Sequence, residues 1–296
     1  MKMEKLTIVM PVYNEEDSLP IILNDWLELC KSARCQLVVV NDGSSDRSVE
    51  ILQNLQKAHG FSILNHKVNK GYGGAIKTGI KAVETEYLVT IDADGQHQPQ
   101  NVVSMYDKMI AEDGDLLIGA RMNESNLTAR NIGKWMIRVL SRILLPNRIM
   151  DLNSGLKMYR TDLAKRYIKI CPDSMAFSDI MALTFIAEKC KVLEIPIQIK
   201  PRVGGKSKIN LRSAIDTVVE IINIVVFFNP LRLFLPLALI FLLAGLAWGL
   251  PIVLAGRGVS TGALLAFTIS GIVLLLGLIA EQLSQIRRML ADDRKD

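Results

Sequence analysis

Cysteine and histidine are scarce in this sequence, and their spacing does not fit a metal site. The four cysteines, Cys30, Cys35, Cys171 and Cys190, form no CxxC pair and have no histidine partner at the spacing of zinc ligands. We therefore expect free thiols in a reducing compartment, and neither a structural zinc nor a disulfide framework. A signal peptide is also not expected, because the first apolar run, Leu6–Val12, has only the length of a strand and a polar turn follows it.

Charged residues are absent from two long stretches toward the C-terminus. Residues 233–255 and 259–280 contain no Asp, Glu, Lys or Arg, and each is long enough to cross the hydrocarbon layer as a helix. The linker Gly256–Gly258 is short, so we expect a two-helix transmembrane hairpin; burial of both helices in a soluble core is the less favoured alternative. Basic residues crowd the outer flanks, which by the positive-inside rule predicts cytoplasmic termini and a cytoplasmic preceding domain. These residues are Arg202, Lys206, Lys208, Arg212, Arg232, Arg287, Arg288, Arg294 and Lys295.

The first 208 residues instead alternate short apolar runs with amphipathic stretches. Runs with the length and composition of strands occur at residues 6–13, 36–42, 61–66, 87–94, 115–121, 154–160 and 192–200. Stretches with apolar residues at helical spacing follow most of these runs. This alternation predicts an α/β fold with a mostly parallel sheet and helices on both faces. The formal net charge of +5 is modest, and we expect no nucleic-acid partner.

Two carboxylates follow one of the predicted strands, in LVTIDADGQHQP (residues 88–99). Asp92 and Asp94 are two positions apart, so on an extended backbone both side chains lean to the same side. Paired carboxylates suit Mg²⁺ or Mn²⁺, which prefer oxygen ligands and often take substrate phosphates as further ligands. Gln96 is a candidate third ligand through its amide oxygen, whereas His97 is expected to pack rather than to ligate. The alternative is a solvated turn, but the position after a buried strand favours the metal site.

Two other polar clusters and Arg121 also fall at the ends of strand-like runs, and a glycine-rich segment opens one of the helical stretches. PVYNEE (residues 11–16) offers Tyr13 to stack on a base and Glu15 to bind a ribose hydroxyl or a base amine. NDGSSD (residues 41–46) offers Asp42 to accept hydrogen bonds from a nucleobase or a ribose. The glycines of NKGYGGA (residues 69–75) are typical of a loop that approaches phosphate before a helix, although the P-loop pattern is absent. Ordinary packing for Tyr13 and a helix-capping turn for Asp42 are the alternatives.

In order and spacing, PVYNEE, NDGSSD and DADGQ resemble the motifs of the family-2 glycosyltransferases, which have the GT-A fold. This resemblance extends to about residue 125. The segments GAR (119–121), NSGLKMYR (153–160) and RVGGKSK (202–208), ahead of a membrane hairpin, are similar to those of the polyprenyl-phosphate glycosyltransferases. That group includes dolichyl-phosphate mannose synthases and undecaprenyl-phosphate glucosyl- and aminoarabinosyl-transferases. The QxxRW motif of processive polysaccharide synthases is absent, which argues against that group.

The resemblance implies inverting, metal-dependent transfer of a hexose from a nucleotide sugar, UDP-linked rather than GDP-linked, to undecaprenyl or dolichyl phosphate. Mg²⁺ or Mn²⁺ is the implied cofactor. Because a phosphate acceptor is already ionised near neutral pH, it needs cations that hold it rather than a strong base. The implied catalytic residues are Asp94, Arg121 and Arg202. The implied nucleotide-sugar site consists of Pro11, Tyr13, Glu15, Asp42, Lys70, Gly71, Asp92, Ser207 and Lys208. The implied acceptor-phosphate site consists of Arg121, Arg130, Lys134 and Arg202. The implied metal site consists of Asp92, Asp94 and Gln96.

Three of these assignments have stated alternatives. Any single arginine of the acceptor group could instead be an ordinary surface charge, and the choice between Arg130 and Lys134 is open because that segment varies in length. Asp179 stands where the family has an acidic residue near the acceptor, or it is a helix N-terminal charge. The loop RVGGKSK (202–208) is expected to order over the donor and to shield the site from water.

The expected organisation has four parts. A catalytic GT-A domain spans residues 1–208, and an amphipathic helix spans 209–229, in the membrane interface or, as the alternative, buried against the soluble domain. Two membrane spans occupy 230–286, and a basic cytoplasmic tail spans 287–296. We expect a membrane-bound homo-oligomer. The alternative functions are transfer to another lipid acceptor, either a lipid-linked saccharide or diacylglycerol, and a catalytically silent membrane scaffold of the same fold.

Overall fold

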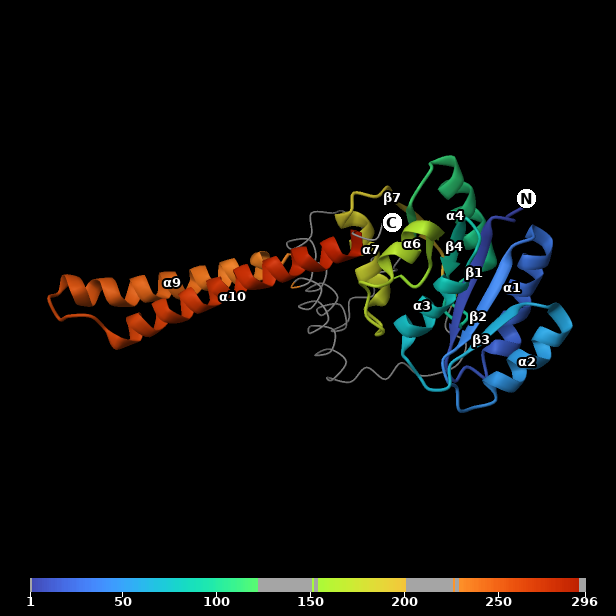
Figure 1. Cartoon of the computed structure of the whole chain (residues 1–296), viewed down its shortest axis with the longest axis horizontal. Coiled ribbons are helices and arrows are strands. Elements are labelled where there is room, and N and C mark those ends of the chain that lie inside the picture. The colour runs from blue at the N-terminus through green and yellow to red at the C-terminus, as the bar shows by residue number, and fades with distance from the viewer. Residues whose placement is uncertain (1, 122–150, 152–153, 201–225, 227–228, 293–296) are drawn as a thin grey trace. The chain divides into compact units, whose positions relative to one another are not determined.

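The computed structural model describes residues 2–121, 151, 154–200, 226 and 229–292. These residues divide between two compact units, a domain that carries the sheet and a helical hairpin. Figure 1 shows both units and labels most of their elements.

Seven strands form one sheet in the order β3-β2-β1-β4-β6-β5-β7. The strands are β1 (Leu6–Val12), β2 (Gln36–Asn41), β3 (Ser62–Asn65), β4 (Tyr87–Thr90), β5 (Leu116–Arg121), β6 (Lys157–Arg160) and β7 (Val192–Ile197). Strand β6 runs antiparallel to both of its neighbours, β4 and β5. The other paired strands are parallel. The predicted mostly parallel sheet is therefore confirmed.

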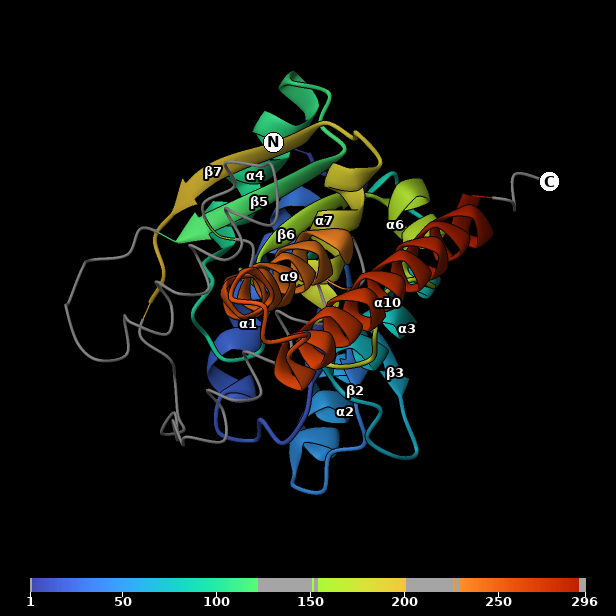
Figure 2. The same ribbon diagram turned by 90° about the vertical axis from the view of Figure 1, so that its left-hand side faces the viewer.

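Helices cover both faces of the sheet, as predicted, and Figure 2 shows them from a second direction. On one face α1 packs against α2 and α4, and on the other α3 packs against α6 and α7. Alternate residues of β2 separate the two sides: Leu37 and Val39 join the main core, whereas Val38 and Val40 pack with Ala75 of α3. The helices are α1 (Leu19–Ala33), α2 (Ser48–His59), α3 (Tyr72–Ala82), α4 (Pro99–Ala111), α6 (Thr161–Tyr167) and α7 (Phe177–Ala187).

The six parallel strands end at a common edge, and this edge carries the predicted polar clusters. One expectation is wrong in detail, because β4 ends at Thr90 and does not extend to Asp94. Strand β6 pairs with β4 only as far as Thr90, which faces Lys157. The chain then turns at Gly95, whose φ of 78° is left-handed, before α4 begins. Asp92 and Asp94 therefore lie in a turn and not on one face of an extended strand.

The second unit contains α9 (Leu231–Leu254) and α10 (Thr261–Asp292), which pack side by side as a hairpin. Within its two apolar segments, Leu231–Leu254 and Thr261–Ile286, the most apolar stretches of 18 residues have mean hydropathies of 2.5 and 2.6. Small residues lie at the contact, where Ser270 Oγ donates to the carbonyl of Ala238 at 2.8 Å. Large apolar side chains point outward on both helices. Length, composition and outward apolar surface fit a membrane hairpin. Helix α10 continues to Asp292, beyond residue 280, where the predicted apolar stretch ends.

Candidate active site

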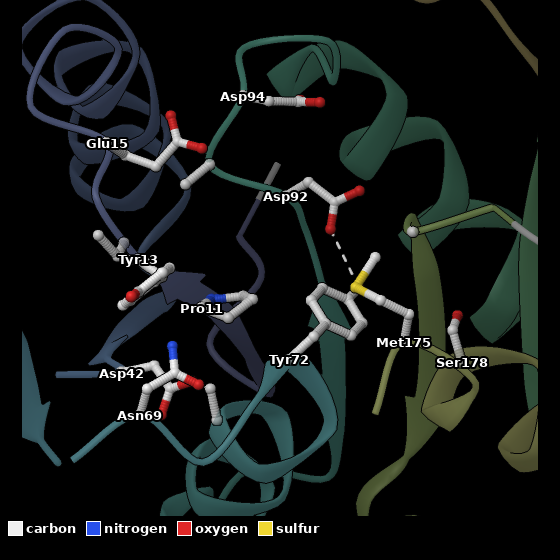
Figure 3. Close-up of a pocket in the computed structure, with 14 residues that line it drawn as sticks. Pro11, Tyr13, Glu15, Asp42, Asn69, Tyr72, Asp92, Asp94, Met175 and Ser178 are labelled. Carbon is white, nitrogen blue, oxygen red and sulfur yellow. Dashed lines mark hydrogen bonds between the residues drawn. The ribbon is translucent and has the colours of Figure 1, made fainter. Parts of the chain in front are cut away.

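A cavity of about 350 Å³ opens at the C-terminal edge of the sheet (Figure 3). Six of the residues predicted from the sequence line it: Pro11, Tyr13, Glu15, Asp42, Asp92 and Asp94. The other lining residues are Val12, Asn69, Tyr72, Ala75, Ala93, Gly155, Met175 and Ser178. Residues that are far apart in the sequence thus converge on one hollow, where the fold rule for parallel sheets places ligands.

The turn after β1 presents Tyr13 and Glu15 to this cavity. The Tyr13 side chain is 48% exposed, so its ring is available to a ligand. Glu15 is held in place because its carboxylate accepts a hydrogen bond from Ser18 Oγ at 2.6 Å. The turn is joined to the one after β2, since Asn14 Oδ1 accepts the amide of Ser45 at 2.8 Å. The first two polar clusters of the sequence therefore form one connected rim.

Asp42 is buried at the end of β2 and is the acceptor of several hydrogen bonds. Its Oδ1 accepts the amide of Lys70 and its Oδ2 accepts the amide of Gly71, both at 2.9 Å. Gly71 has a φ of 87°, and a Cβ there would lie 2.6 Å from the carbonyl oxygen of Asp173. The turn before α3 thus wraps around the Asp42 carboxylate, and the amides of Lys70 and Gly71 are directed to it.

Asp92 is fixed by contacts on both of its carboxylate oxygens. Tyr72 Oη donates to Oδ1 at 3.0 Å, and His97 Nε2 lies 3.5 Å from Oδ2. Burial raises the pKa of Asp92, but the contacts with His97 and Tyr72 outweigh burial and hold its pKa below the ordinary value. Burial also raises the pKa of Tyr72 well above normal, which keeps its hydroxyl a donor. A Cβ on Gly155 would lie 2.1 Å from Asp92 Oδ2, so this carboxylate fits only beside a glycine.

Two carboxylates in this arrangement fit a divalent cation whose remaining ligands are water and a diphosphate. Asp94 Oδ1 accepts the amide of Gln96 at 3.0 Å, which fixes that carboxylate as well. Among the residues that the structure describes, no three acidic, histidine or cysteine side chains gather as a complete ligand set. Asp92 and Asp94, which both line the cavity, are the two carboxylates that would hold such an ion. For Gln96 the structure gives a backbone bond to Asp94, and its predicted role as a ligand stays a prediction.

Arg121 lies at the end of β5 and forms a two-pronged ion pair with Asp151. Its Nε and Nη2 donate to Oδ2 and Oδ1 of Asp151 at 2.7 and 2.9 Å. This pair uses two of the five N–H groups of a guanidinium. The hydrogen bonds with Asp151 raise the pKa of Arg121, so the cation is permanent. The other predicted residues of the acceptor and donor loops, Arg130, Lys134, Arg202, Ser207 and Lys208, lie outside the described residues.

The geometry agrees with comparisons to known protein families. Residues 7–168 match the family described as glycosyl transferase family 2, and residues 229–286 match the GtrB C-terminal hairpin. The chain belongs to glycosyl transferase family 2. Its second unit is the hairpin of a GtrB-like member of that family.

Similar curated members of family 2 are undecaprenyl-phosphate 4-deoxy-4-formamido-L-arabinose transferases. The protein of that name from Sodalis glossinidius is 30% identical over 254 residues, which cover 84% of this chain and 76% of that protein. The one from Yersinia enterocolitica is 28% identical and covers 96% of this chain and 90% of that protein.

Solved structures show the same fold at low sequence identity. Glucosyl-3-phosphoglycerate synthase from Mycobacterium tuberculosis, in complex with Mn²⁺, UDP and phosphoglyceric acid, has a TM-score of 0.58 at 14% identity, covering 75% of this chain and 78% of that one. S. aureus TarS 1-349 in complex with UDP-GlcNAc has a TM-score of 0.55 at 17% identity and covers 76% of this chain. This chain spans 66% of the length of that TarS chain. Below 25% identity these likenesses show the fold of this chain and not its activity.

The family-2 site also contains residues that the sequence did not single out. Lys157 is fully buried, and its Nζ donates to the carbonyl of Ser154 at 2.8 Å and to Ser178 Oγ. Burial lowers the pKa of Lys157 to about 8, against the attraction of Asp179 and Asp151. Ser178 lines the cavity from α7, so Lys157 supports the cavity wall from behind. A lysine within the strand-like NSGLKMYR was the available signal, because lysine is rarely buried without a partner.

Proposed function

We propose that this chain transfers a sugar from a nucleotide sugar to the phosphate of a polyprenyl lipid. One observation carries the proposal: Asp42, Asp92 and Asp94 line a single cavity in a family-2 chain that ends in an apolar hairpin. In the reaction the bond from the anomeric carbon to the nucleotide's phosphate oxygen breaks, and a bond to the lipid's phosphate oxygen forms. The nucleoside diphosphate leaves, and attack from the opposite face inverts the anomeric carbon.

The donor half of the proposal uses the connected rim and the two aspartates of the turn after β4. Tyr13 stacks on the base, Glu15 binds the ribose, and Asp42 accepts a hydrogen bond from the base edge. A Mg²⁺ or Mn²⁺ ion on Asp92, Asp94 and Gln96 would stabilise the charge that develops on the departing diphosphate. We propose uridine rather than guanosine as the base, and the structures that share the fold in complex with UDP support that choice.

The acceptor half of the proposal uses cations. Arg121 holds the phosphate of the lipid together with Arg130 or Lys134 and Arg202, because guanidinium groups grip phosphate oxygens in pairs. Asp151 already orients Arg121 by a bidentate contact, and this arrangement supports a fixed phosphate-binding cation. Ser207 and Lys208 belong to the loop that we propose closes over the donor. Undecaprenyl phosphate is the first acceptor to test, since the names of similar family members specify it.

The identity of the sugar is a separate part of the proposal. The sequence led us to expect a hexose, whereas the similar proteins carry the name of an arabinose derivative, which is a pentose. Our proposal therefore specifies glycosyl transfer, and the hexose stays a prediction that a panel of donors tests against 4-deoxy-4-formamido-L-arabinose.

For the location we propose a membrane-bound enzyme with residues 1–208 and both termini on the cytoplasmic side. The outward apolar side chains of α9 and α10 support two spans, and residues 209–229 would lie in the interface. We also propose a homo-oligomer.

Metal-dependent nucleotide binding tests the donor half of the proposal. Full-length protein in detergent should bind UDP more tightly with Mn²⁺ than without it, as measured by isothermal titration calorimetry. In Asp94→Asn the gain from Mn²⁺ should fall at least about tenfold, which is about 1.4 kcal/mol. Asp107→Asn is the matched control, because Asp107 is exposed on α4 and outside the cavity. Wild-type protein that binds no UDP under any metal condition would support the silent scaffold instead.

A further inference from the structure

His66 is a buried side chain that the proposed reaction does not use directly. It follows β3 by one residue, and its amide donates to the carbonyl of Asn41 at 2.9 Å, which extends the pairing of β2 with β3. Its side chain is 5% exposed. Because the backbone of the neighbouring strand fixes it, the ring has a defined position behind the cavity.

Both ring nitrogens of His66 contact polar side chains. Nδ1 lies 2.6 Å from Oδ1 of Asp42, and Nε2 lies 2.9 Å from Oγ1 of Thr78 on α3. Thr78 Oγ1 in turn donates to the carbonyl of Gly74 at 3.0 Å. A continuous set of hydrogen bonds therefore connects the end of β2 to the first turns of α3 through this one ring.

The direction of each hydrogen bond follows from the partners. The carboxylate oxygens of Asp42 accept two backbone amides, so Nδ1 of His66 is the donor to the same carboxylate. Thr78 has a single hydroxyl hydrogen and gives it to Gly74, so Thr78 accepts from Nε2. Nδ1 thus anchors the Asp42 carboxylate, and Nε2 anchors the ring to α3.

We propose that His66 is the positioning residue of the nucleotide-binding carboxylate: through Nδ1–H it holds the Asp42 side chain oriented toward the base of the donor. The inference rests on the proposed function and deepens its donor half. Burial of a carboxylate is unfavourable unless its oxygens are hydrogen-bonded, and His66 adds a side-chain donor to the two backbone amides before the nucleotide arrives. The ring also fixes the turn that carries Asn69, since the amides of Lys70 and Gly71 bind the same carboxylate. Preorganisation of this kind strengthens substrate binding without adding a contact to the substrate.

Two substitutions separate the roles of the two ring nitrogens. In His66→Asn the side-chain amide nitrogen stands close to the position of Nδ1 and can still donate to Asp42. In His66→Gln it stands close to Nε2, so the contact with Thr78 is kept and the one with Asp42 is lost. We expect UDP affinity within about threefold of wild type for His66→Asn, and at least about tenfold weaker for His66→Gln, a loss of about 1.4 kcal/mol.

Kinetics distinguishes positioning from a general structural role. The KM for the nucleotide sugar should rise in His66→Gln while kcat at saturating donor changes less than about twofold. His59→Gln is the matched control, because His59 is exposed at the end of α2 and should leave both constants unchanged. Equal losses of UDP affinity in the Asn and Gln variants, or a fall in kcat with an unchanged KM, would overturn the proposal.

A second variant keeps the test available if His66→Gln does not fold. Thr78→Val removes the acceptor of Nε2 without altering a residue that lines the cavity. We expect UDP affinity to fall about threefold, about 0.7 kcal/mol, and to recover in Thr78→Ser. Unchanged UDP affinity in Thr78→Val would overturn the idea that Thr78 acts on Asp42 through the His66 ring. If the wild-type protein binds no UDP, the proposed class of donor is wrong. If the wild type binds UDP normally and the His66→Asn and His66→Gln variants bind it equally well, only the role of His66 is refuted.

Discussion

Replacement of Gly155 by alanine should damage the metal site through a single added methyl group. The new Cβ would lie 2.1 Å from Oδ2, 2.7 Å from Cγ and 2.9 Å from Oδ1 of Asp92. The carboxylate cannot simply swing away, because Tyr72 and His97 contact its two oxygens. Overpacking of this kind costs about 1–3 kcal/mol in stability. A shift of the Asp92 side chain would relieve part of that cost. The shifted carboxylate could then no longer bind the metal ion together with Asp94.

Two assays measure the two consequences of Gly155→Ala. Thermal unfolding of the full-length protein should show a lower Tm, by about 2–4 °C for each kcal/mol lost. The gain in UDP affinity that Mn²⁺ produces should fall at least about tenfold, about 1.4 kcal/mol. Gly271→Ala is the matched control, since a Cβ at that position in α10 meets nothing within 4 Å. Gly155→Ala protein with wild-type Tm and wild-type Mn²⁺-dependent binding would refute the reasoning.

Three further predictions follow from the hydrogen bonds and burial around the cavity. Tyr72→Phe removes the donor to Asp92 and should weaken Mn²⁺-dependent UDP binding by about tenfold in calorimetry; equal binding would show that the hydroxyl does not position the carboxylate. Asp151→Asn loosens Arg121 and should raise the KM for the lipid phosphate about tenfold at an unchanged donor KM, and a lower acceptor KM would contradict this. Burial lowers the pKa of Lys157 from 10.5 to about 8, so the unfolded chain binds more protons between these values and stability should rise with pH by about 3 kcal/mol across that window. In Lys157→Met this rise in stability between pH 8 and pH 10.5 should be absent from thermal unfolding. Identical pH profiles for the variant and the wild type would contradict the prediction.

The sequence predicted the sheet well because its signal is local. Apolar runs of strand length and the helical spacing between them determine an α/β fold without knowledge of distant contacts. The polar clusters could be placed at one edge because parallel strands end on the same side. The direction of β6 could not be predicted from its own residues, since Lys157–Arg160 would fit a parallel or an antiparallel neighbour equally well.

The contacts that build the site from distant segments were not predictable from local patterns. Tyr72 and Ser178 reach the cavity from α3 and α7. Tyr72 lies in NKGYGGA, where Lys70 and Gly71 were the predicted contacts, and Ser178 lies in none of the motifs. The extended-strand argument for Asp92 and Asp94 was wrong about the backbone, although both residues line the cavity. Gly155 carried a usable signal, because a glycine within a strand-like run often marks a close approach of another group.

Formation of a labelled lipid tests the central claim most directly. Full-length protein with Mn²⁺ would be incubated with undecaprenyl phosphate and a panel of labelled nucleotide sugars that includes UDP-linked hexoses, a GDP-linked hexose and UDP-linked 4-deoxy-4-formamido-L-arabinose. Parallel reactions would contain diacylglycerol or a lipid-linked saccharide, and Asp94→Asn would serve as the inactive variant. The account predicts label in undecaprenyl phosphate from at least one UDP-sugar, with release of UDP and loss of the product in Asp94→Asn. Label in diacylglycerol or the lipid-linked saccharide alone, or no labelled lipid from any donor while UDP still binds, would contradict it.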